Sequence, residues 1–409
     1  MRRITRRTII LNITCDVLVL SVEFMQSSGN TEITEKMGIV DTSTEKILKH
    51  NKSERQKFLM FAWLEIAVGA CLYYSGLVKL AQMWTQKSGP KLVILCHHSA
   101  SGGHLRSQFL YLKRHYRILH LEAALEELYG ISKNAKRDRR TLLVAAFDDG
   151  YNDNYTDAFA IACELQIPIT IFLVPQNIES GQPFTWVAGE YHHLVPYAQV
   201  DEATIEGRTY RLRNPAERVK LTQVIDDHAR YPTSIANREE FLASIRKALA
   251  VPLALTEGEK RDMPLTWTEV QEMEESSWVS FGAHTMHHPM LTCLADPLEV
   301  DYEIRESRAV LEEKLGHTVR TFAYPYGDFG VRELQAVRAA KYDWAVTTIH
   351  GFNIPQTDPH LLYRIVVGEH QHWLVIAAKV SGVWEIFLRP CRALVRLAKR
   401  IVGRKSTTA

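Results

Sequence analysis

Six short apolar runs, most of them separated by helix-like stretches, limit most strongly how this chain can fold. The runs are apolar throughout and do not alternate with polar residues, which is typical of strands buried on both faces. Stretches with helical periodicity, such as 155–164, 297–315 and 331–340, lie between them. Alternation of such strands with helices indicates parallel strands, and so predicts an α/β barrel or a doubly wound sheet. The predicted strands are 91–98, 141–147, 167–174, 278–282, 321–324 and 344–348.

A long segment at 180–265 interrupts this alternation of strands and helices. Its sequence is mixed and helix-rich, and it is too long to be an ordinary connection between two elements. We therefore interpret residues 91–370 as one domain that carries an insertion. We expect the insertion to cover one rim of the sheet and to shape the substrate groove.

The sequence before this domain indicates contact with a membrane. Residues 1–56 are predicted to form a variable, flexible segment, because they are polar and charged over much of their length. The stretch 57–84 contains an apolar run from Phe58 to Val78 with one charge, Glu65, and about 20 apolar residues suffice to cross a bilayer. We predict a membrane-associated helix at 57–84. Whether it spans the bilayer, lies on it or packs on the domain stays open.

The C-terminal residues 372–409 are predicted to contain a basic amphipathic helix. Over 388–402, apolar residues fall on one helical face and basic residues on the opposite face, and no acid occurs in 389–405. Such a helix favours an anionic membrane surface, although a helix packed on the domain would show the same pattern. Membrane contact is therefore expected through 57–84 and 386–405.

The composition also bears on which partners the protein binds and where in the cell it is located. Nucleic acid is not expected, because no aromatic residues are interleaved with the basic ones. Four arginines among the first seven residues would keep the N-terminus in the cytoplasm if 57–84 spans the bilayer. We therefore predict a membrane-associated protein on the cell-envelope side, with the cytoplasmic face as the alternative. The six cysteines are scattered, so neither a disulfide framework nor a zinc ribbon is predicted.

Two adjacent carboxylates follow the predicted strand 141–147 directly. They are Asp148 and Asp149, and Gly150 after them permits a sharp turn. Adjacent side chains at a strand end point in different directions. One carboxylate can therefore bind a metal ion while its neighbour stays free beside it.

A pair of histidines follows the predicted strand 278–282. His284 and His288 are four residues apart, which brings both imidazoles to one side of the backbone. His287 is a competing ligand, and the four-residue spacing favours His288. Two imidazoles and one carboxylate, with open positions for water and substrate, suit a catalytic Zn²⁺, Fe²⁺ or Co²⁺.

A third motif, Phe-Ala-Tyr-Pro-Tyr-Gly-Asp at 322–328, completes a recognisable series. Together, Phe147-Asp-Asp-Gly150, the histidine pair and this motif resemble, in order, the motifs of the polysaccharide deacetylase family. That family is carbohydrate esterase family 4, with its NodB-homology domain, and the resemblance covers roughly 91–370. It implies a distorted (β/α) barrel of about seven parallel strands with a metal in the groove at the strand ends. It also implies hydrolysis of an N-acetyl group on an amino sugar.

The resemblance also implies roles for individual residues. Asp149, His284 and His288 would hold one divalent metal ion, with zinc expected first and cobalt, iron or nickel as alternatives. Asp148 would be the general base that deprotonates the attacking water. The backbone N–H of Tyr326 would help to stabilise the tetrahedral oxyanion.

The chain departs from the family pattern at two positions. Many members have an arginine that pairs with the base where this chain has Ala323, and a subgroup with the same F-A-Y-P-Y-G motif shares this difference. Arg364 resembles that subgroup's late arginine, and either pairs with Asp148 or forms a surface salt bridge. The general acid has no clean match. His98 is the first candidate and His370 the weaker one, and either could instead be structural.

The leading hypothesis is a metal-dependent hydrolase that removes N-acetyl groups from the amino sugars of a polysaccharide, peptidoglycan or glycolipid. Its partner would be an N-acetylated glycan. The alternatives are a non-catalytic glycan- or lipid-binding module on the same barrel and a related hydrolase of a non-sugar amide. Bound metal and acetate release would distinguish an enzyme from a binding module.

Overall fold

Seven parallel strands close into a barrel in the computed structural model of this chain, which describes residues 52–131, 138–182, 184, 194–251, 263–368 and 370–388. Around the barrel the order is β1, β3, β4, β7, β8, β9 and β10, and β10 pairs with β1 to complete the circle. Of the two predicted architectures, the barrel is therefore confirmed. The strands are β1 (Leu92–His97), β3 (Leu142–Phe147), β4 (Ile169–Leu173), β7 (Val279–Ala283), β8 (Thr321–Ala323), β9 (Trp344–His350) and β10 (Leu362–Val366).

The strands are buried on both faces, as their apolar sequences predict. Every residue of β1, β3 and β4 is buried. A short additional strand, β2 (Arg117–Ile118), pairs with the first residues of β3 outside the closed circle. Because the strands are parallel, all their carboxyl ends meet at one end of the barrel, where polar side chains can converge.

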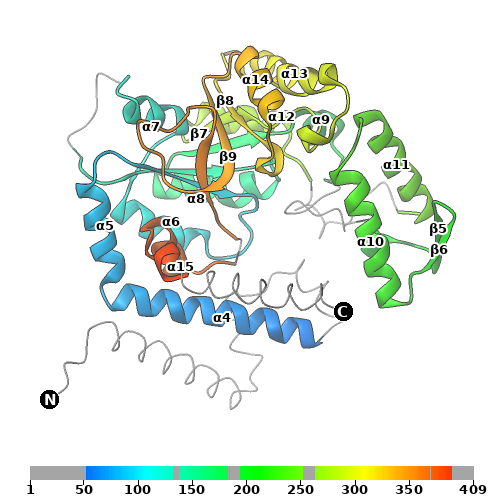
Figure 1. The fold of residues 1–409 in the computed structure, drawn as a ribbon, viewed down its shortest axis with the longest axis horizontal. Coiled ribbons are helices and arrows are strands. Elements are labelled where there is room, and N and C mark those ends of the chain that lie inside the picture. Colours follow the sequence, from blue (N-terminus) through cyan, green and yellow to red (C-terminus); the bar gives the residue numbers. More distant parts are fainter. Residues whose placement is uncertain are drawn as a thin grey trace, which may run out of the picture.

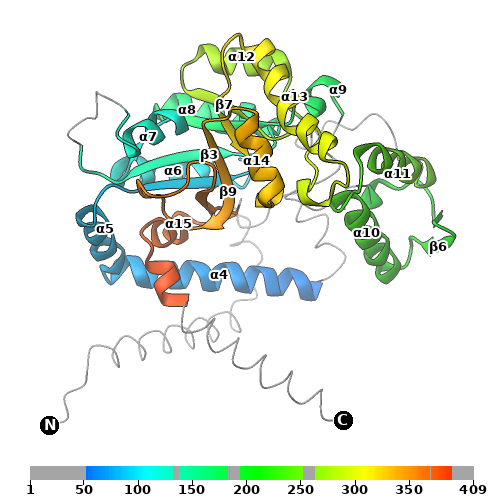
Figure 2. The ribbon, with the colours of Figure 1, turned by 45° about the horizontal axis from the view of Figure 1, so that its top comes forward.

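Helices surround this barrel on the outside (Figures 1 and 2). The helical periodicity at 297–315 and 331–340 is confirmed by two of these helices. Asp296 caps the first of them by accepting a hydrogen bond from the N–H of Leu298, with Pro297 in the first turn. The helices are α6 (Leu105–His115), α7 (Leu121–Leu128), α8 (Ala160–Leu165), α9 (Pro175–Ser180), α12 (Trp267–Glu275), α13 (Pro297–Leu315), α14 (Val331–Ala339) and α15 (Trp373–Val380).

The segment expected to be an insertion forms a separate lobe beside the barrel (Figure 1, green). Its antiparallel hairpin of β5 (Glu202–Ile205) and β6 (Arg208–Arg211) is followed by two helices, α10 (Pro215–Arg230) and α11 (Ile235–Ala248). The lobe has its own apolar core. It is joined to the barrel by a hydrogen bond from the N–H of Ile235 to the carboxylate of Glu299 at 2.6 Å.

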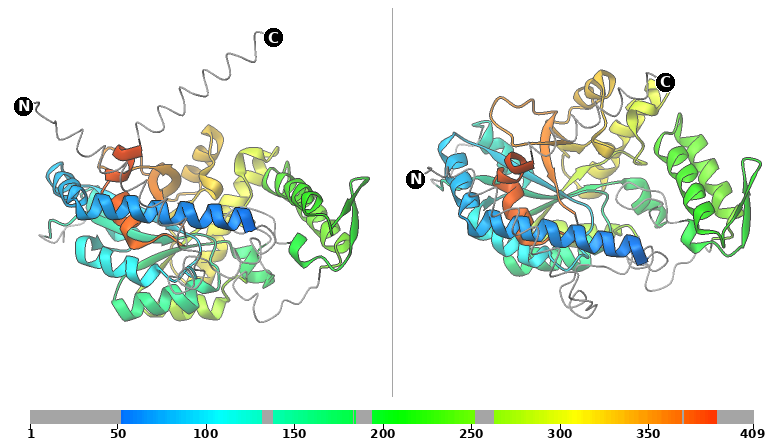
Figure 3. Two further views of the ribbon diagram at one scale, coloured as in Figure 1. Left: turned by 90° about the horizontal axis from the view of Figure 1, so that it is seen from below. Right: turned by 60° about the horizontal axis from the view of Figure 1, so that its bottom comes forward.

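Two helices stand where a single apolar helix was expected at 57–84. Helix α4 (Lys52–Tyr74) runs along the barrel and packs on α15, and α5 (Leu77–Lys87) turns away from it by 66° (Figures 1 and 3). Gly76, at a φ of 81°, makes this turn. Within the described residues no single helix passes the length and apolarity test for a membrane span, whereas this bent pair passes it together. Most of 1–56 and of the predicted helix at 388–402 lies outside the described residues.

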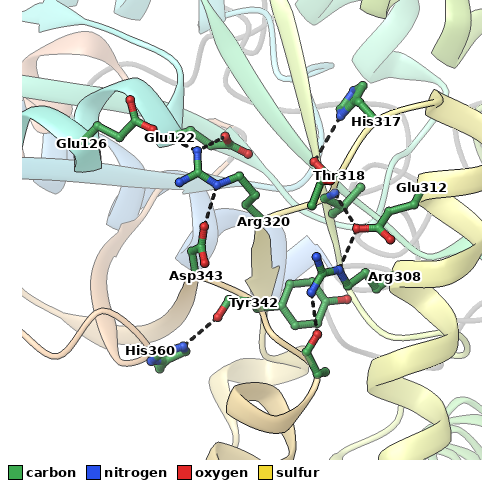
Figure 4. A network of polar contacts seen from close by, with 12 residues as sticks. Glu122, Glu126, Arg308, Glu312, His317, Thr318, Arg320, Tyr342, Asp343 and His360 are labelled. Atoms are coloured by element: carbon green, nitrogen blue, oxygen red, sulfur yellow. Dashed lines mark hydrogen bonds and ion pairs between the residues drawn. The ribbon is translucent and has the colours of Figure 1, made fainter. Parts of the chain in front are cut away.

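A network of ion pairs ties the outer helices to the amino-terminal end of the barrel (Figure 4). Arg320, just before β8, bonds to Glu122 and Glu126 of α7 at 3.1 and 2.9 Å. It also pairs with Asp343 at 2.6 Å and lies over the ring of Trp344 at 4.4 Å. The ion pairs of Arg320 therefore help to hold this end of the barrel together.

Candidate metal centre and active site

The carboxylate pair lies at the carboxyl end of β3, where the chain turns sharply. Asp149 has a φ of 73° and Gly150 a φ of 82°. A Cβ at Gly150 would lie only 2.7 Å from a side-chain carbon of Leu173, so a larger residue would have to displace Leu173 and would be strained at this positive φ. This turn directs the two carboxylates to different neighbours.

Asp149, His284 and His288 come together as a buried cluster. Each offers one ligand atom, and these atoms lie within 4.8 Å of one another. The Nε2 atoms of His284 and His288 are 3.6 and 3.4 Å from Oδ1 of Asp149. The donor set is one carboxylate and two imidazoles, which is the kind of set that binds a catalytic divalent cation.

The state of His284 suits metal binding. Its Nδ1 lies 2.8 Å from the backbone oxygen of Ala323 and must donate there, which leaves the lone pair on Nε2 towards Asp149. Burial lowers the pKa of His284 to about 4. Burial also lowers the pKa of His288 well below its ordinary value, and the neighbouring His284 disfavours a second positive charge there. Both imidazoles are therefore neutral near pH 7, as metal ligands must be.

His287, the competing ligand in the sequence, is held by another residue. Its Nδ1 lies 2.6 Å from one carboxylate oxygen of Glu303, and its backbone N–H donates to the other at 2.9 Å. Glu303 is fully buried on α13. This contact turns His287 away from the cluster and leaves His288 beside His284, so the four-residue spacing is the one that the structure uses.

Four non-glycine residues around this cluster have left-handed backbone conformations. Such conformations cost on the order of 1–3 kcal/mol each and persist only where the surrounding structure enforces them. Their presence indicates that the fold holds the turns of the site in a fixed geometry. These residues and their φ values are Asp149 (73°), Thr285 (64°), His288 (55°) and Tyr326 (58°).

Asp148, the other carboxylate, is paired with Arg364. Oδ1 of Asp148 accepts a hydrogen bond from Nη1 of Arg364 at 2.7 Å, and Nε of Arg364 donates to the backbone oxygen of Thr347 at 2.7 Å. Burial raises the pKa of Asp148, but the adjacent guanidinium outweighs it, so the pKa lies below its usual range. Asp148 is therefore ionised at neutral pH.

This ion pair resolves one alternative left by the sequence. The predicted contact between Arg364 and Asp148 is confirmed, and a surface salt bridge is excluded because Arg364 is fully buried. The arginine comes from the middle of β10, whereas Ala323, where the resemblance implies the usual arginine, is the last residue of β8. Ala323 instead supplies the backbone oxygen that orients His284.

A second group of possible ligands, Cys96, His98 and Asp148, lies beside the first. The thiol of Cys96 donates to Oδ2 of Asp148 at 3.4 Å, and burial raises its pKa well above the ordinary value. A protonated thiol and the positive charge of Arg364 both disfavour a cation here. We interpret this group as the surroundings of the base and not as a second metal site.

His98 lies at the end of β1, where a loop holds it near Asp148. The side-chain amide of Asn154 donates to the backbone oxygen of His98 at 2.9 Å, and Asp153 accepts from the N–H of Ala100 at 3.0 Å. Burial lowers the pKa of His98. His370, the weaker candidate, follows β10 and lies near His104, whose pKa is lowered first by burial and then by His372 and His370.

Tyr326 packs against the histidine pair. Its ring is 4.8 Å from that of His288, and the guanidinium of Arg230 lies 5.6 Å from its centre. Arg230 ends α10, so the insertion reaches the site. A second arginine of the insertion, Arg238, donates to the backbone oxygen of His287 at 2.8 Å. No sequence motif marked either arginine, because their positions depend on how the lobe docks.

Comparison with known proteins identifies similar chains. The sequence matches the family model for polysaccharide deacetylases over residues 135–345. A curated relative, the Bacillus subtilis protein YxkH, whose name assigns it provisionally to the polysaccharide deacetylases, is 31% identical over 122 residues, or 27% of this chain. The match spans only 38% of that relative's length.

Two solved structures are also similar to this chain. The Streptococcus pyogenes deacetylase PplD in complex with acetate shares 18% identity with a TM-score of 0.47, covering 71% of this chain and 99% of PplD. IcaB from Ammonifex degensii shares 19% identity with a TM-score of 0.45, covering 72% of this chain and 98% of IcaB.

Proposed function

Because this chain belongs to the polysaccharide deacetylase family, we propose that it is a metal-dependent hydrolase that removes N-acetyl groups from the amino sugars of a glycan. The observation that carries the proposal is the pairing of two groups at one end of the barrel. A buried cluster suited to a cation, Asp149 with His284 and His288, lies beside a buried, ionised carboxylate, Asp148. A module that only bound glycans would have little use for that second carboxylate.

The donor set supports a divalent cation as the cofactor. Neutral imidazoles with Nε2 directed at a carboxylate fit Zn²⁺ first, with cobalt, iron and nickel as alternatives. When bound, such a cation supplies a Lewis acid that polarises the acetyl carbonyl and acidifies water. Asp149, His284 and His288 are the residues that would hold it.

Asp148 is proposed as the general base. Arg364 holds one of its oxygens at 2.7 Å and keeps the carboxylate ionised, ready to accept a proton from the attacking water. A low pKa makes Asp148 a weak base, so it is effective only where the water has been acidified. The base would therefore work only when the cluster of Asp149, His284 and His288 holds a cation.

The remaining steps need an oxyanion donor and an acid. We assign the first role to the backbone N–H of Tyr326, whose ring packs on His288. His98, held near Asp148 by the loop after β1, is the candidate that protonates the departing amine. Because burial lowers the pKa of His98, it is neutral at rest, so the proton that it delivers to the amine must be the one that Asp148 takes from the attacking water.

Acetate release from N-acetyl-chitooligosaccharides by the zinc-loaded protein tests this proposal. Chelation should abolish release, and Asp148→Asn should lower it by about 10²–10⁴-fold, since a general base contributes that much. Normal turnover in Asp148→Asn would show that Asp148 is not the general base. A protein that binds glycan but holds no metal and releases no acetate would instead be the non-catalytic module.

A further inference from the structure

Helix α5 exposes a row of large apolar side chains. Leu80, Met83 and Trp84 are 62%, 46% and 76% exposed, and their spacing of three and four residues puts them on one helical face. Tyr74, at the end of α4, is 75% exposed at the preceding corner. We call Leu80, Met83 and Trp84 the α5 ridge. Single exposed apolar residues are common, whereas a cluster of them marks an interaction surface.

A hollow of about 710 Å³ lies next to this ridge, at the end of the barrel where β1 and β3 begin. Met83 belongs to both the ridge and the lining of the hollow. Four cationic side chains also line it: Lys87, Lys91, Arg139 and Arg140. The sequence adds one further lysine, Lys79, and 66–91 contains no acid. We call this feature the basic hollow.

Acids in the lining do not cancel the positive charge. Asp138 pairs with Arg140 at 2.7 Å, and Glu127 pairs with Arg117 at 2.6 Å. Each acid is thus matched by an arginine of its own. The other cations of the hollow remain as an excess of positive charge beside an apolar ridge.

We propose that the α5 ridge and the basic hollow together dock the protein on a bilayer of anionic phospholipids. Trp84 and its apolar neighbours would enter the interface between head groups and acyl chains, where tryptophan is enriched. The lysines would contact lipid phosphates, because cationic side chains near an anionic surface are attracted to it. A second copy of this chain fits less well, because a symmetric pair would bring two cationic hollows face to face.

The docking surface and the site lie at opposite ends of the barrel. Lys91 directly precedes β1 and Leu142 begins β3, whereas Asp148 follows the last residue of β3. A six-residue strand rises about 3.3 Å per residue, so the two ends are about 20 Å apart. On a docked molecule the site faces away from the bilayer.

Vesicle co-sedimentation of the full chain tests the proposal. We expect binding to vesicles of phosphatidylglycerol mixed with phosphatidylcholine, weakened roughly tenfold or more in Leu80→Gln/Trp84→Gln, because two large apolar groups no longer enter the interface. Lys87→Glu/Lys91→Glu should weaken binding to the anionic vesicles only. The matched control is Leu298→Gln/Val331→Gln, at exposed apolar positions on α13 and α14, away from α5 (Figure 1).

Each outcome decides the proposal independently of the chemistry, because vesicle binding needs neither metal nor substrate. Circular dichroism and acetate release without vesicles check that the variants fold. Equal binding by the parent chain and Leu80→Gln/Trp84→Gln would overturn the proposal. So would a ridge variant that changed only the oligomeric mass by light scattering, since the ridge would then be a protein interface.

Discussion

At the scale of single residues, the ion pair between Asp148 and Arg364 matters most for both activity and stability. Both side chains are buried, Arg364 completely and Asp148 almost completely. Removing one partner of a buried pair leaves the other charge uncompensated, which costs far more than the pair contributes. The base and the stability of the barrel therefore depend on the same contact.

Arg364→Gln is expected to destabilise the protein by about 3–5 kcal/mol, since a buried charge is left unpaired. It should also reduce acetate release, because Asp148 loses its orientation. Urea unfolding measures the first effect and turnover the second. Arg338→Gln, which breaks the partly exposed pair with Asp358, is the control and should cost about 1 kcal/mol or less. Equal losses in the two variants would contradict this account.

Glu303 is a positioning residue, because it holds the turn between the two histidine ligands through His287. Glu303→Gln should weaken metal binding by about 10–100-fold, the usual effect of removing a group that orients a ligand turn. Equilibrium dialysis with Zn²⁺ measures this. Glu313→Gln, exposed on the same helix, should leave the metal affinity unchanged. An unchanged metal affinity in Glu303→Gln would show that the turn keeps its conformation without the contact to Glu303.

The site residues that stand in motifs could be predicted from the sequence, whereas the residues that support them could not. Asp148, Asp149 and the histidines follow apolar runs, so their place at the strand ends could be predicted. Glu303 could not, because it is one of several acids on a long helix and nothing in the sequence shows that it is buried. Arg230 was missed for a similar reason, since its contact with Tyr326 depends on the docking of a separate lobe.

At the scale of elements, the turn after β8 is the most tightly packed part of the site. Gly327 has a φ of 69°, and a Cβ there would lie 2.0 Å from Oγ1 of Thr348 on β9. That hydroxyl also donates to the backbone oxygen of Tyr326 at 3.2 Å. The turn that presents Tyr326 is thus fixed by its contact with the next strand.

Gly327→Ala should destabilise the protein by about 2–4 kcal/mol, because backbone strain and a steric clash add together. Gly316→Ala is the matched control: its φ is 75°, yet a Cβ there would have no heavy atom within 4 Å. It should cost only about 1 kcal/mol, from the left-handed backbone alone. Thermal or urea unfolding of both variants separates the clash from the strain. Equal costs would rule out the clash.

The barrel strand that could not be assigned from the sequence is β10, which carries Arg364. An arginine in the middle of Leu362–Val366 interrupts the apolar run by which buried strands are recognised. Only the pairing with Asp148 makes that position tolerable inside a barrel. The break between α4 and α5 was also not foreseen, because one glycine in an apolar run does not by itself end a helix.

At the scale of the whole molecule, metal binding should appear as stability. A ligand that binds only the folded state stabilises it by about 2.7 kcal/mol at 100 times its Kd. Zn²⁺ at that excess should therefore raise the unfolding free energy by this amount, and chelation should remove the gain. Asp149→Ala lacks one proposed ligand and should show a much smaller shift. An equal gain in Asp149→Ala would place the binding elsewhere.

Closure of the barrel also sets the order in which the site can mature. The strands follow one another around the circle in chain order, and β10, the last of them, pairs with β1, the first. During synthesis the motif of Asp148 leaves the ribosome well before Arg364. Until β10 takes its place between β9 and β1, the carboxylate lacks its counter-charge and the circle stays open. The nascent chain therefore acquires a competent base only when nearly all of the barrel has been made.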